Sequence, residues 1–218
     1  MVSLQPHIAV GIVDDEAFVR SALRVYLSNT EDIEVIGEAA GGTEAISMVE
    51  NSNPDVLLLD LQMPDLDGVE VTRRLREKGF TTRIVVVTAH VDDQYVTPAL
   101  LAGASGYIVK DSEPQKIVQS VRDVTRGELV IDPQVIRYLI DAASRSNPAK
   151  NMGVSAVTER EKQVLQELCA GSSNSEMASH LFLSESTIKY YLSNLMRKFD
   201  SRDRVQLIVS AFRAGLVA

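Results

Sequence analysis

The first part of the chain alternates short apolar runs with segments of helical spacing. Five runs rich in Val and Ile are bounded by turn residues, as strands are, and three of them are nearly all apolar, which is typical of strands buried on both faces of a parallel sheet. Between the runs, apolar residues recur three or four positions apart, as at Phe18, Ala22, Val25 and Tyr26. The pattern predicts an α/β domain built from five βα units, with a doubly wound five-stranded parallel sheet. The predicted strands are residues 7–13, 33–39, 55–60, 83–88 and 106–110.

Beyond residue 133 the pattern becomes wholly helical. Thr158, followed by Glu161 three positions later, predicts a capping box that opens a helix, and Gly171 ends it. Three more helical segments follow with short joints, at 174–181, 184–199 and 202–215. A short helix is expected at 134–144, and the polar, Pro- and Gly-containing segment 145–156 is typical of a linker. We therefore expect a first domain at 1–128, a helix and linker at 129–156, and a small all-α domain at 157–218.

The net charge of −8 is divided unevenly over these parts. Residues 1–149 carry −10 and residues 150–218 carry +2. An acidic N-terminal part repels nucleic acid, whereas the C-terminal part permits contact with it. The single cysteine excludes an internal disulfide framework. The chain has no apolar run near the roughly 20 residues of a membrane span and no signal-peptide pattern at its start, so we expect a cytoplasmic protein without a membrane partner.

Chemically reactive side chains stand where the predicted strands end. Asp14 and Asp15 end the first strand, Asp60 the third, Thr88 the fourth and Lys110 the fifth. The carboxyl ends of parallel strands share one edge, and three carboxylates there repel one another unless a divalent cation that prefers oxygen ligands, Mg²⁺ above all, lies between them. A phosphoryl group on Asp60 would need a metal, a cation and a hydrogen-bond donor, which Asp15, Lys110 and Thr88 can supply.

Two further aspartates, Asp65 and Asp67, follow Asp60 in "QMPDLDG". A lone Asp in such a loop is usually a turn or cap residue. We therefore interpret both as structural, with Asp67 capping the helix that starts after it.

With its ordered acidic pair, aspartate, hydroxyl and lysine, the segment 5–126 resembles the receiver domain of bacterial two-component response regulators, which have a flavodoxin-like fold. The resemblance implies that Asp60 accepts a phosphoryl group from a sensor histidine kinase. It also implies that Lys110 pairs with the phosphoryl group. The implied Mg²⁺ ligands are Asp14, Asp15, Asp60 and the main-chain carbonyl of Gln62.

The same resemblance makes Thr88 and Tyr107 a switch pair. Thr88 would move toward the phosphoryl group, the Tyr107 ring would turn inward, and the surface around the last strand would change its partner contacts. Gln62 and His90, each two positions beyond a site residue, are expected to modulate the lifetime of the phosphoryl group.

An enzymatic alternative also uses an aspartyl phosphate. Phosphatases of the haloacid dehalogenase type need a second Asp two positions after the nucleophile as general acid. Gln62 stands there, and the acidic pair lies on the first strand, so we do not expect an enzyme. A nucleotide-binding protein is excluded because "GIVDDEAFV" has neither the Gly-rich turn nor a phosphate-binding lysine.

In the C-terminal part, the segments 174–181 and 185–199 could form a helix-turn-helix. The second has an apolar stripe at helical spacing and a polar opposite side. From spacing alone, that polar side fits an ordinary solvated face as well as a helix that enters the major groove of DNA. The stripe consists of Ile188, Tyr191, Leu192, Leu195, Met196 and Phe199, and the polar side of Lys189, Tyr190, Ser193, Asn194 and Arg197.

The motif "VTEREKQVL" and the helical segments after it resemble the LuxR-type helix-turn-helix, over about residues 154–217. Joined to a receiver, this resemblance indicates the NarL/FixJ family. It implies that Lys189, Tyr190 and Ser193 contact bases, that Asn194 and Arg197 lie nearer phosphate, and that the last helix supports dimerisation. The expected function is transcription regulation, with phosphorylation favouring a homodimer on double-stranded DNA. The alternative is an adaptor whose helices bind polymerase.

Overall fold

The computed structural model describes residues 7–89, 93–131, 135 and 157–217. His90, the predicted linker 145–156 and, apart from Val135, the predicted helix 134–144 lie outside the described residues. The chain divides into two compact units, Met1–Val130 and Ile131–Ala218. Over the described ranges, no helix combines the length and the apolar character that crossing a bilayer requires.

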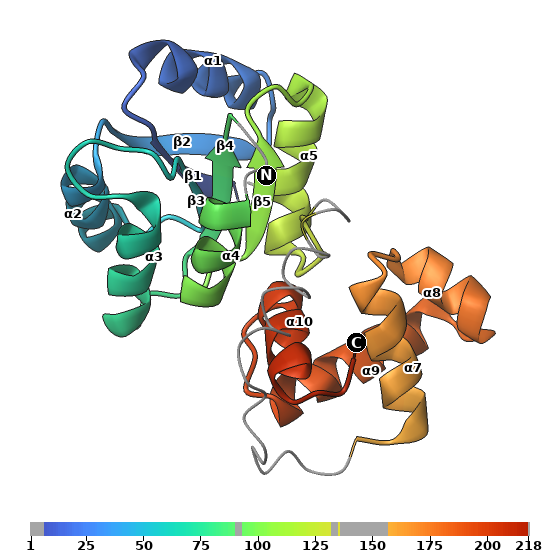
Figure 1. Cartoon of the computed structure of the whole chain (residues 1–218). Helices are drawn as coiled ribbons and strands as arrows, with labels where there is room; N and C mark the ends of the chain where they lie inside the picture. The colour runs from blue at the N-terminus through green and yellow to red at the C-terminus, as the bar shows by residue number, and fades with distance from the viewer. Residues whose placement is uncertain (1–6, 90–92, 132–134, 136–156, 218) are drawn as a thin grey trace. The chain divides into compact units, whose positions relative to one another are not determined.

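The first unit is a five-stranded, all-parallel sheet with the strand order β2-β1-β3-β4-β5 (Figure 1). This is the order of a flavodoxin-like doubly wound fold, in which the order reverses between β1 and β3. The predicted fold class is therefore confirmed, and each predicted strand agrees with the structure to within one residue at either end. The strands are β1 (Ile8–Val13), β2 (Ile33–Ala39), β3 (Val56–Leu59), β4 (Arg83–Thr88) and β5 (Gly106–Val109).

Two apolar cores cover the two faces of the sheet, and the short strand β3 contributes to both. Val56 and Leu58 pack with α1 and α5, whereas Leu57 and Leu59 pack with α2 and α3. Because successive side chains of a strand point to opposite faces, an unbroken apolar run is what a strand between two helical layers requires. The helices are α1 (Ala17–Ser28), α2 (Gly42–Ser52), α3 (Gly68–Glu77), α4 (Asp93–Ala102) and α5 (Pro114–Thr125).

Helix α1 forms where its spacing predicts a helix, but only part of the stripe that predicted it faces the core, since Tyr26 packs against the buried residues of the sheet. Leu23 and Leu27 are buried, while Phe18 and Val25 are 83% and 57% exposed. Helix α1 has two interleaved apolar stripes, and the periodicity of either one predicts a helix. Which residues of the two stripes are buried depends on how the helix is rotated against β1 and β2.

In the second unit, residues 157–217 fold into helices that share an apolar core, to which Leu165, Ile188 and Phe212 contribute. The predicted capping box is present, because Thr158 and Glu161 exchange backbone and side-chain hydrogen bonds at the start of α7. Gly171 has a φ of +83°, the left-handed conformation that ends a helix. The helices are α7 (Glu159–Cys169), α8 (Asn174–Leu181), α9 (Glu185–Lys198) and α10 (Arg204–Arg213).

A partly buried ion pair joins the start of α7 to the end of α9. The Lys198 ammonium lies 2.7 Å from Oε2 of Glu161, whose side chain is 6% exposed. Burial alone would raise the pKa of Glu161, but the hydrogen bonds from Lys198 and Thr158 hold it below its usual value. One carboxylate thus caps α7 and fixes α9 to it.

We expect Lys198→Met to destabilise this unit by about 2 kcal/mol, because it removes the charged partner of a buried carboxylate. Hydrogen exchange of the α7 and α9 amides in the full chain measures the effect. The lowered pKa means that the pair stabilises the fold above the unfolded value of 4.5 and that this contribution is lost as the pH falls below it. The difference from the wild type should therefore shrink in acid. The control, Lys162→Met, removes a half-exposed lysine 3.6 Å from Glu159 and should change exchange little. An equal effect of both variants would contradict the prediction.

Candidate functional site

Three aspartates meet at the carboxyl edge of the sheet. Asp14 follows β1 and Asp60 follows β3, and the two strands are neighbours in the sheet. One carboxylate oxygen from each of Asp14, Asp15 and Asp60 lies within 4.8 Å of the others. Asp14 and Asp60 are buried, with 1% and 4% of their surfaces exposed, whereas Asp15 is exposed. The three carboxylates therefore lie together, as the sequence predicted.

Lys110 reaches into the same cluster from the end of β5. Its Nζ atom lies 2.7 Å from Oδ2 of Asp14, 3.2 Å from Oδ2 of Asp60 and 3.5 Å from Oε1 of Glu16. The other oxygen of Asp60, Oδ1, accepts a 2.8 Å hydrogen bond from the Leu61 N–H. Glu16 was not among the predicted site residues; its place directly after the acidic pair was the available signal. The lysine therefore bridges the carboxylates that the sequence predicted would repel one another.

Protonation of the cluster reflects burial and charge together. Burial raises the pKa of Asp60, the Lys110 charge counteracts this, Asp14 adds to it, and the pKa ends above its usual value. For Lys110, burial lowers the pKa, but the contacts with Asp14 and Asp60 outweigh it and the pKa is raised. An added positive charge stabilises the ionised form of a buried carboxylate whose pKa is raised. The donor set of carboxylate oxygens fits a hard divalent cation such as Mg²⁺.

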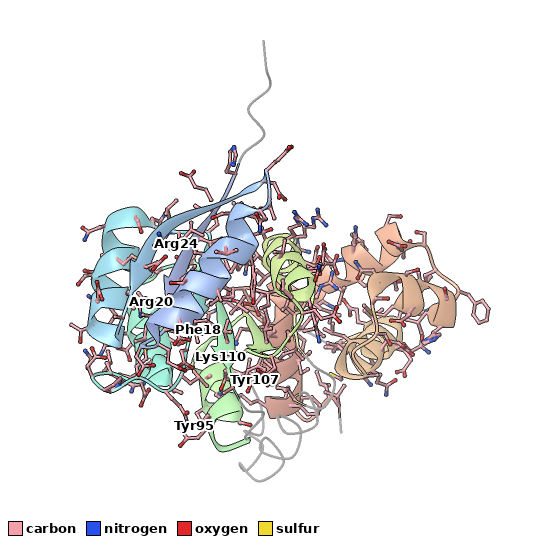
Figure 2. The ribbon with its side chains drawn as sticks, turned by 90° about the horizontal axis from the view of Figure 1, so that it is seen from above. Phe18, Arg20, Arg24, Tyr95, Tyr107 and Lys110 are labelled. Atoms are coloured by element: carbon pink, nitrogen blue, oxygen red, sulfur yellow. The ribbon has the colours of Figure 1, made fainter. Side chains whose placement is uncertain are left out.

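Thr88 and Tyr107 lie on the two strands beside this cluster. Thr88 pairs with Val109 in the β4–β5 ladder, and its carbonyl accepts a 2.6 Å hydrogen bond from the Lys110 N–H. Tyr107, labelled in Figure 2, lies two residues before Val109 on β5. Its side chain is buried, with only 3% of the residue exposed. Gln62, in the loop after Asp60, is exposed. The ladder thus places the hydroxyl and lysine positions side by side at one edge.

Asp67 and Asp65 are cap residues, but they cap different helices. Asp67 accepts a 2.8 Å hydrogen bond from the Glu70 N–H and caps α3, as predicted. Asp65 accepts from the N–H groups of Gly42 and Thr43, both at 2.9 Å, and so caps α2. These bonds lower the pKa of Asp65 far below its usual value. The structural interpretation of Asp65 is therefore confirmed, but the helix that it caps begins 23 residues earlier in the sequence and not in its own loop.

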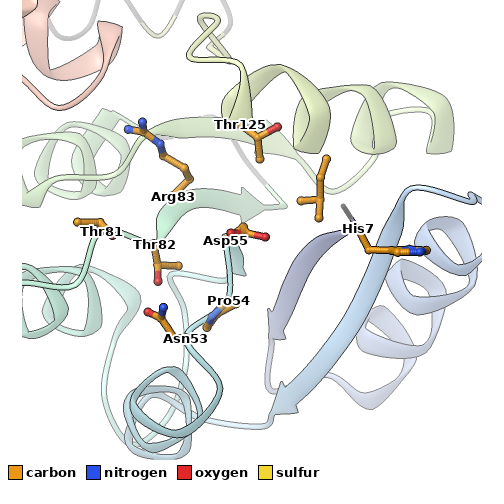
Figure 3. Close-up of a pocket in the computed structure, with 9 residues that line it drawn as sticks. His7, Asn53, Pro54, Asp55, Thr81, Thr82, Arg83 and Thr125 are labelled. Atoms are coloured by element: carbon orange, nitrogen blue, oxygen red, sulfur yellow. The ribbon is translucent and has the colours of Figure 1, made fainter. Parts of the chain in front are cut away.

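An open hollow of about 460 Å³ lies at the opposite, amino-terminal edge of the sheet (Figure 3). Its lining includes His7, Asp55 and Arg83, but the Asp55 carboxylate already accepts a 2.9 Å hydrogen bond from the Ala9 N–H. Asp55 therefore links the start of β3 to β1. The carboxyl edge, where the buried charges meet, is the better candidate site.

In the second unit, α8 and α9 form the predicted helix-turn-helix. The turn contains Phe182, at a φ of 54°, and Ser184 caps α9. Of the predicted apolar stripe, four residues are buried and two are half-buried: Ile188, Leu192, Leu195 and Phe199, then Tyr191 and Met196. The opposite face carries the exposed side chains of Lys189, Tyr190, Ser193 and Arg197, with Asn194 half-buried.

Two contacts order the polar face of α9. Asn194 Oδ1 accepts a 3.0 Å hydrogen bond from Arg197. The rings of Tyr190 and Tyr191 stand edge to face, with centroids 5.9 Å apart, and Tyr190 is 64% exposed. This face has the side-chain types that contact phosphates and base edges.

Comparisons with known proteins match both units. The profile of the response regulator receiver domain matches residues 10–122, and that of bacterial regulatory proteins of the luxR family matches residues 155–211. An uncharacterized transcriptional regulatory protein, YhcZ of Bacillus subtilis, is 38% identical over 95% of this chain and 96% of its own. The response regulator VraR of Staphylococcus aureus is 36% identical over 96% of this chain and 99% of its own.

Solved structures agree with these relatives. The response regulator ChrA of a heme-sensing two-component system has a TM-score of 0.53 at 31% identity, covering 97% of this chain and all of its own. The receiver domain of the putative response regulator NarL of Mycobacterium tuberculosis has a TM-score of 0.55 at 34% identity, covering 57% of this chain and all of its own. None of these comparisons favours the phosphatase or the polymerase-binding adaptor. The chain belongs to the LuxR/NarL family of response regulators, and it is a two-component transcription regulator that joins a receiver domain to a LuxR-type DNA-binding domain.

Proposed function

We propose that Asp60 accepts a phosphoryl group from the phosphohistidine of a sensor histidine kinase. An Asp60 carboxylate oxygen attacks phosphorus, the P–N bond breaks as the P–O bond forms, and the histidine nitrogen leaves. The observation that carries the proposal is the contact of one lysine, Lys110, with both buried carboxylates, Asp14 and Asp60. Once Asp60 is phosphorylated, the lysine remains beside the phosphoryl oxygens and neutralises part of their charge.

Mg²⁺ would be held by Asp14, Asp15, Asp60 and the carbonyl of Gln62, and when bound it offsets the negative charge of the phosphoryl oxygens. Asp14 and Asp15 supply the fixed oxygens of the site. The hydroxyl of Thr88 donates a hydrogen bond to the phosphoryl group. No external substrate is turned over.

Thr88 and Tyr107 couple phosphorylation of Asp60 to a change of the receiver surface. Thr88 is bound to the Lys110 main chain and lies on the strand next to Tyr107, so a shift of its hydroxyl toward the phosphoryl group changes the packing on β5. The receiver surface changes with it, and phosphorylation favours a homodimer. A dimer on paired half-sites binds DNA more tightly than one protomer alone. The protein acts in the cytoplasm.

A binding-site selection tests this function. The full chain, with Mg²⁺ and with or without a small phosphodonor, is incubated with fragmented genomic DNA, and the retained fragments are sequenced. We expect enrichment of fragments that share paired half-sites, strengthened by the phosphodonor. No enrichment under either condition would contradict DNA binding and favour the adaptor.

Lys189 should carry part of the DNA affinity. It is exposed on the polar face of α9, one turn beyond the helix start at Glu185. We expect Lys189→Ala to weaken binding to a selected site by about tenfold, because a base or phosphate contact is lost. Fluorescence anisotropy over a salt series measures it. The control, Lys162→Ala, removes a half-exposed lysine from α7; equal losses in both variants would show a general charge effect and contradict the assignment.

A further inference from the structure

Arg20 holds the backbone that carries the acidic pair. From the first turns of α1, its Nη1 atom donates to the carbonyl of Asp14 at 2.7 Å and to the carbonyl of Asp15 at 3.2 Å. One guanidinium group therefore bridges two consecutive peptide units. Figure 2 shows Arg20 on α1 together with Arg24, one helical turn further on. Nothing in the sequence pattern distinguished Arg20 from Arg24, the other charged residue of this helix.

The orientation of this guanidinium is itself fixed. Its Nε atom lies 3.7 Å from Oε2 of Glu38 on β2, and the two side chains are only 18% and 21% exposed. Glu38 also binds Arg24, whose side chain is 59% exposed. The carboxylate on the neighbouring strand thus holds Arg20 against the loop and offsets its charge.

The same loop orients the Asp14 carboxylate. Asp14 N–H donates to the Ala39 carbonyl at 3.2 Å, and Oδ1 of Asp14 accepts a 3.0 Å hydrogen bond from the Glu16 N–H. The second oxygen, Oδ2, is left for Lys110. Because the Asp14 side chain is bound to its own turn, any motion of the Asp14 and Asp15 peptides moves the Asp14 carboxylate with it.

We propose that Arg20 is a positioning residue for the divalent cation site, acting through the main chain of Asp14 and Asp15. The inference rests on the proposed function, because it takes these two aspartates as cation ligands. Groups that orient the ligands of a metal without touching it commonly change its affinity by about 10- to 100-fold. Arg20 acts through the main-chain carbonyls of these two residues.

Electrostatics and positioning predict effects of opposite sign. Removing a positive charge near a cation site strengthens cation binding if only the charge matters. Removing the bridge between two peptide units weakens it if the orientation of the ligands matters. The sign of the change therefore separates the two explanations. Arg24 supplies the matched control, since it shares the Glu38 partner and the helix but is exposed.

The test is calorimetric titration of the full chain with MgCl₂, comparing the wild type with Arg20→Met and Arg24→Met. We expect Arg20→Met to raise the Mg²⁺ dissociation constant by about tenfold and Arg24→Met to change it by less than about twofold. Arg20→Lys, which keeps the charge and can reach one carbonyl, should lie between the wild type and Arg20→Met. Thermal unfolding without Mg²⁺ shows whether Arg20→Met is still folded. If it is not, the Mg²⁺ dissociation constants of Arg20→Lys and Arg24→Lys are compared instead.

Each outcome is informative. Unchanged or tighter Mg²⁺ binding in folded Arg20→Met, or equal weakening in both Met variants, would overturn the role of Arg20. A wild type that binds no Mg²⁺ and accepts no phosphoryl group would instead overturn the proposed function. A wild type that does both, with Arg20→Met indistinguishable from it, leaves the proposed function intact and removes only the inference about Arg20.

Discussion

Asp60→Asn should abolish phosphorylation of the protein. When the full chain is incubated with Mg²⁺ and a small phosphodonor, intact-mass measurement of the wild type should show one added phosphoryl group. The adduct should survive acid and be lost in base, as an acyl phosphate is. Asn has an amide nitrogen where Asp60 has an oxygen beside Lys110, so it offers no anionic nucleophile and the signal should fall to background. A chelator should prevent labelling of the wild type.

The matched control is Asp67→Asn, in the same loop. Asp67 caps α3, and Asn is as good an N-cap as Asp, so this variant loses a carboxylate without losing the cap. It should be labelled like the wild type. Equal labelling of Asp60→Asn and Asp67→Asn would show that the phosphoryl group lies elsewhere.

Loss of labelling in Asp60→Asn should not come from loss of fold. The raised pKa of Asp60 means that its ionised form opposes folding at neutral pH and that its contribution becomes favourable only below the unfolded value of 3.8. A neutral Asn removes that penalty. The variant should therefore unfold at the same temperature as the wild type or higher near pH 7, and the difference should diminish in acid.

The strands and the site residues at their ends could be predicted because both depend on local patterns. A strand with an apolar run such as Val56–Leu59 has few alternatives to a buried parallel sheet. Once the sheet is parallel, the residues that follow its strands must meet at one edge. Asp14, Asp60 and Lys110 meet there for this reason, although 50 residues separate Asp60 from Lys110 in sequence.

The contacts that orient the site could not be predicted because they depend on how helices are rotated and how loops approach one another. Asp65 caps α2 across 23 residues of sequence, and nothing near Asp65 identifies that partner. Arg20 looks like any arginine on an amphipathic helix until α1 is placed with Leu23 inward. The chemistry of the site is thus local in sequence, whereas its geometry is set by tertiary packing.

Gly68→Ala should damage both the stability of the receiver and the reactivity of Asp60. Gly68 is the first residue of α3, and a Cβ atom added to it would lie 2.3 Å from the main-chain oxygen of Asp60 and 2.9 Å from Cα of Leu61. Both neighbours are backbone, so no side chain can rotate away. The Gly68 N–H also donates a 3.0 Å hydrogen bond to the Leu61 carbonyl, which closes the loop from Asp60 to α3. The clash must therefore move the main chain that carries Asp60.

We expect Gly68→Ala to lower the free energy of unfolding of the receiver by about 3 kcal/mol, the size of an overpacking penalty that cannot relax. We also expect phosphorylation by the small phosphodonor to slow by roughly tenfold or more, because displacements of about 1 Å in a reactive site have effects of this order. Denaturant unfolding and a time course of intact-mass spectra measure the two effects separately.

Gly79→Ala separates steric displacement from backbone strain. Gly79 follows the other end of α3 at a φ of +82°, and an added Cβ would meet nothing within 4 Å. The left-handed conformation alone should lower the free energy of unfolding by about 1 kcal/mol, without changing the rate of phosphorylation. If Gly68→Ala is phosphorylated as fast as Gly79→Ala, the close approach of α3 to the Asp60 carbonyl does not position the reactive carboxylate. A slower rate in Gly68→Ala alone would show that the packing of α3 against the end of β3 sets where Asp60 stands relative to Lys110.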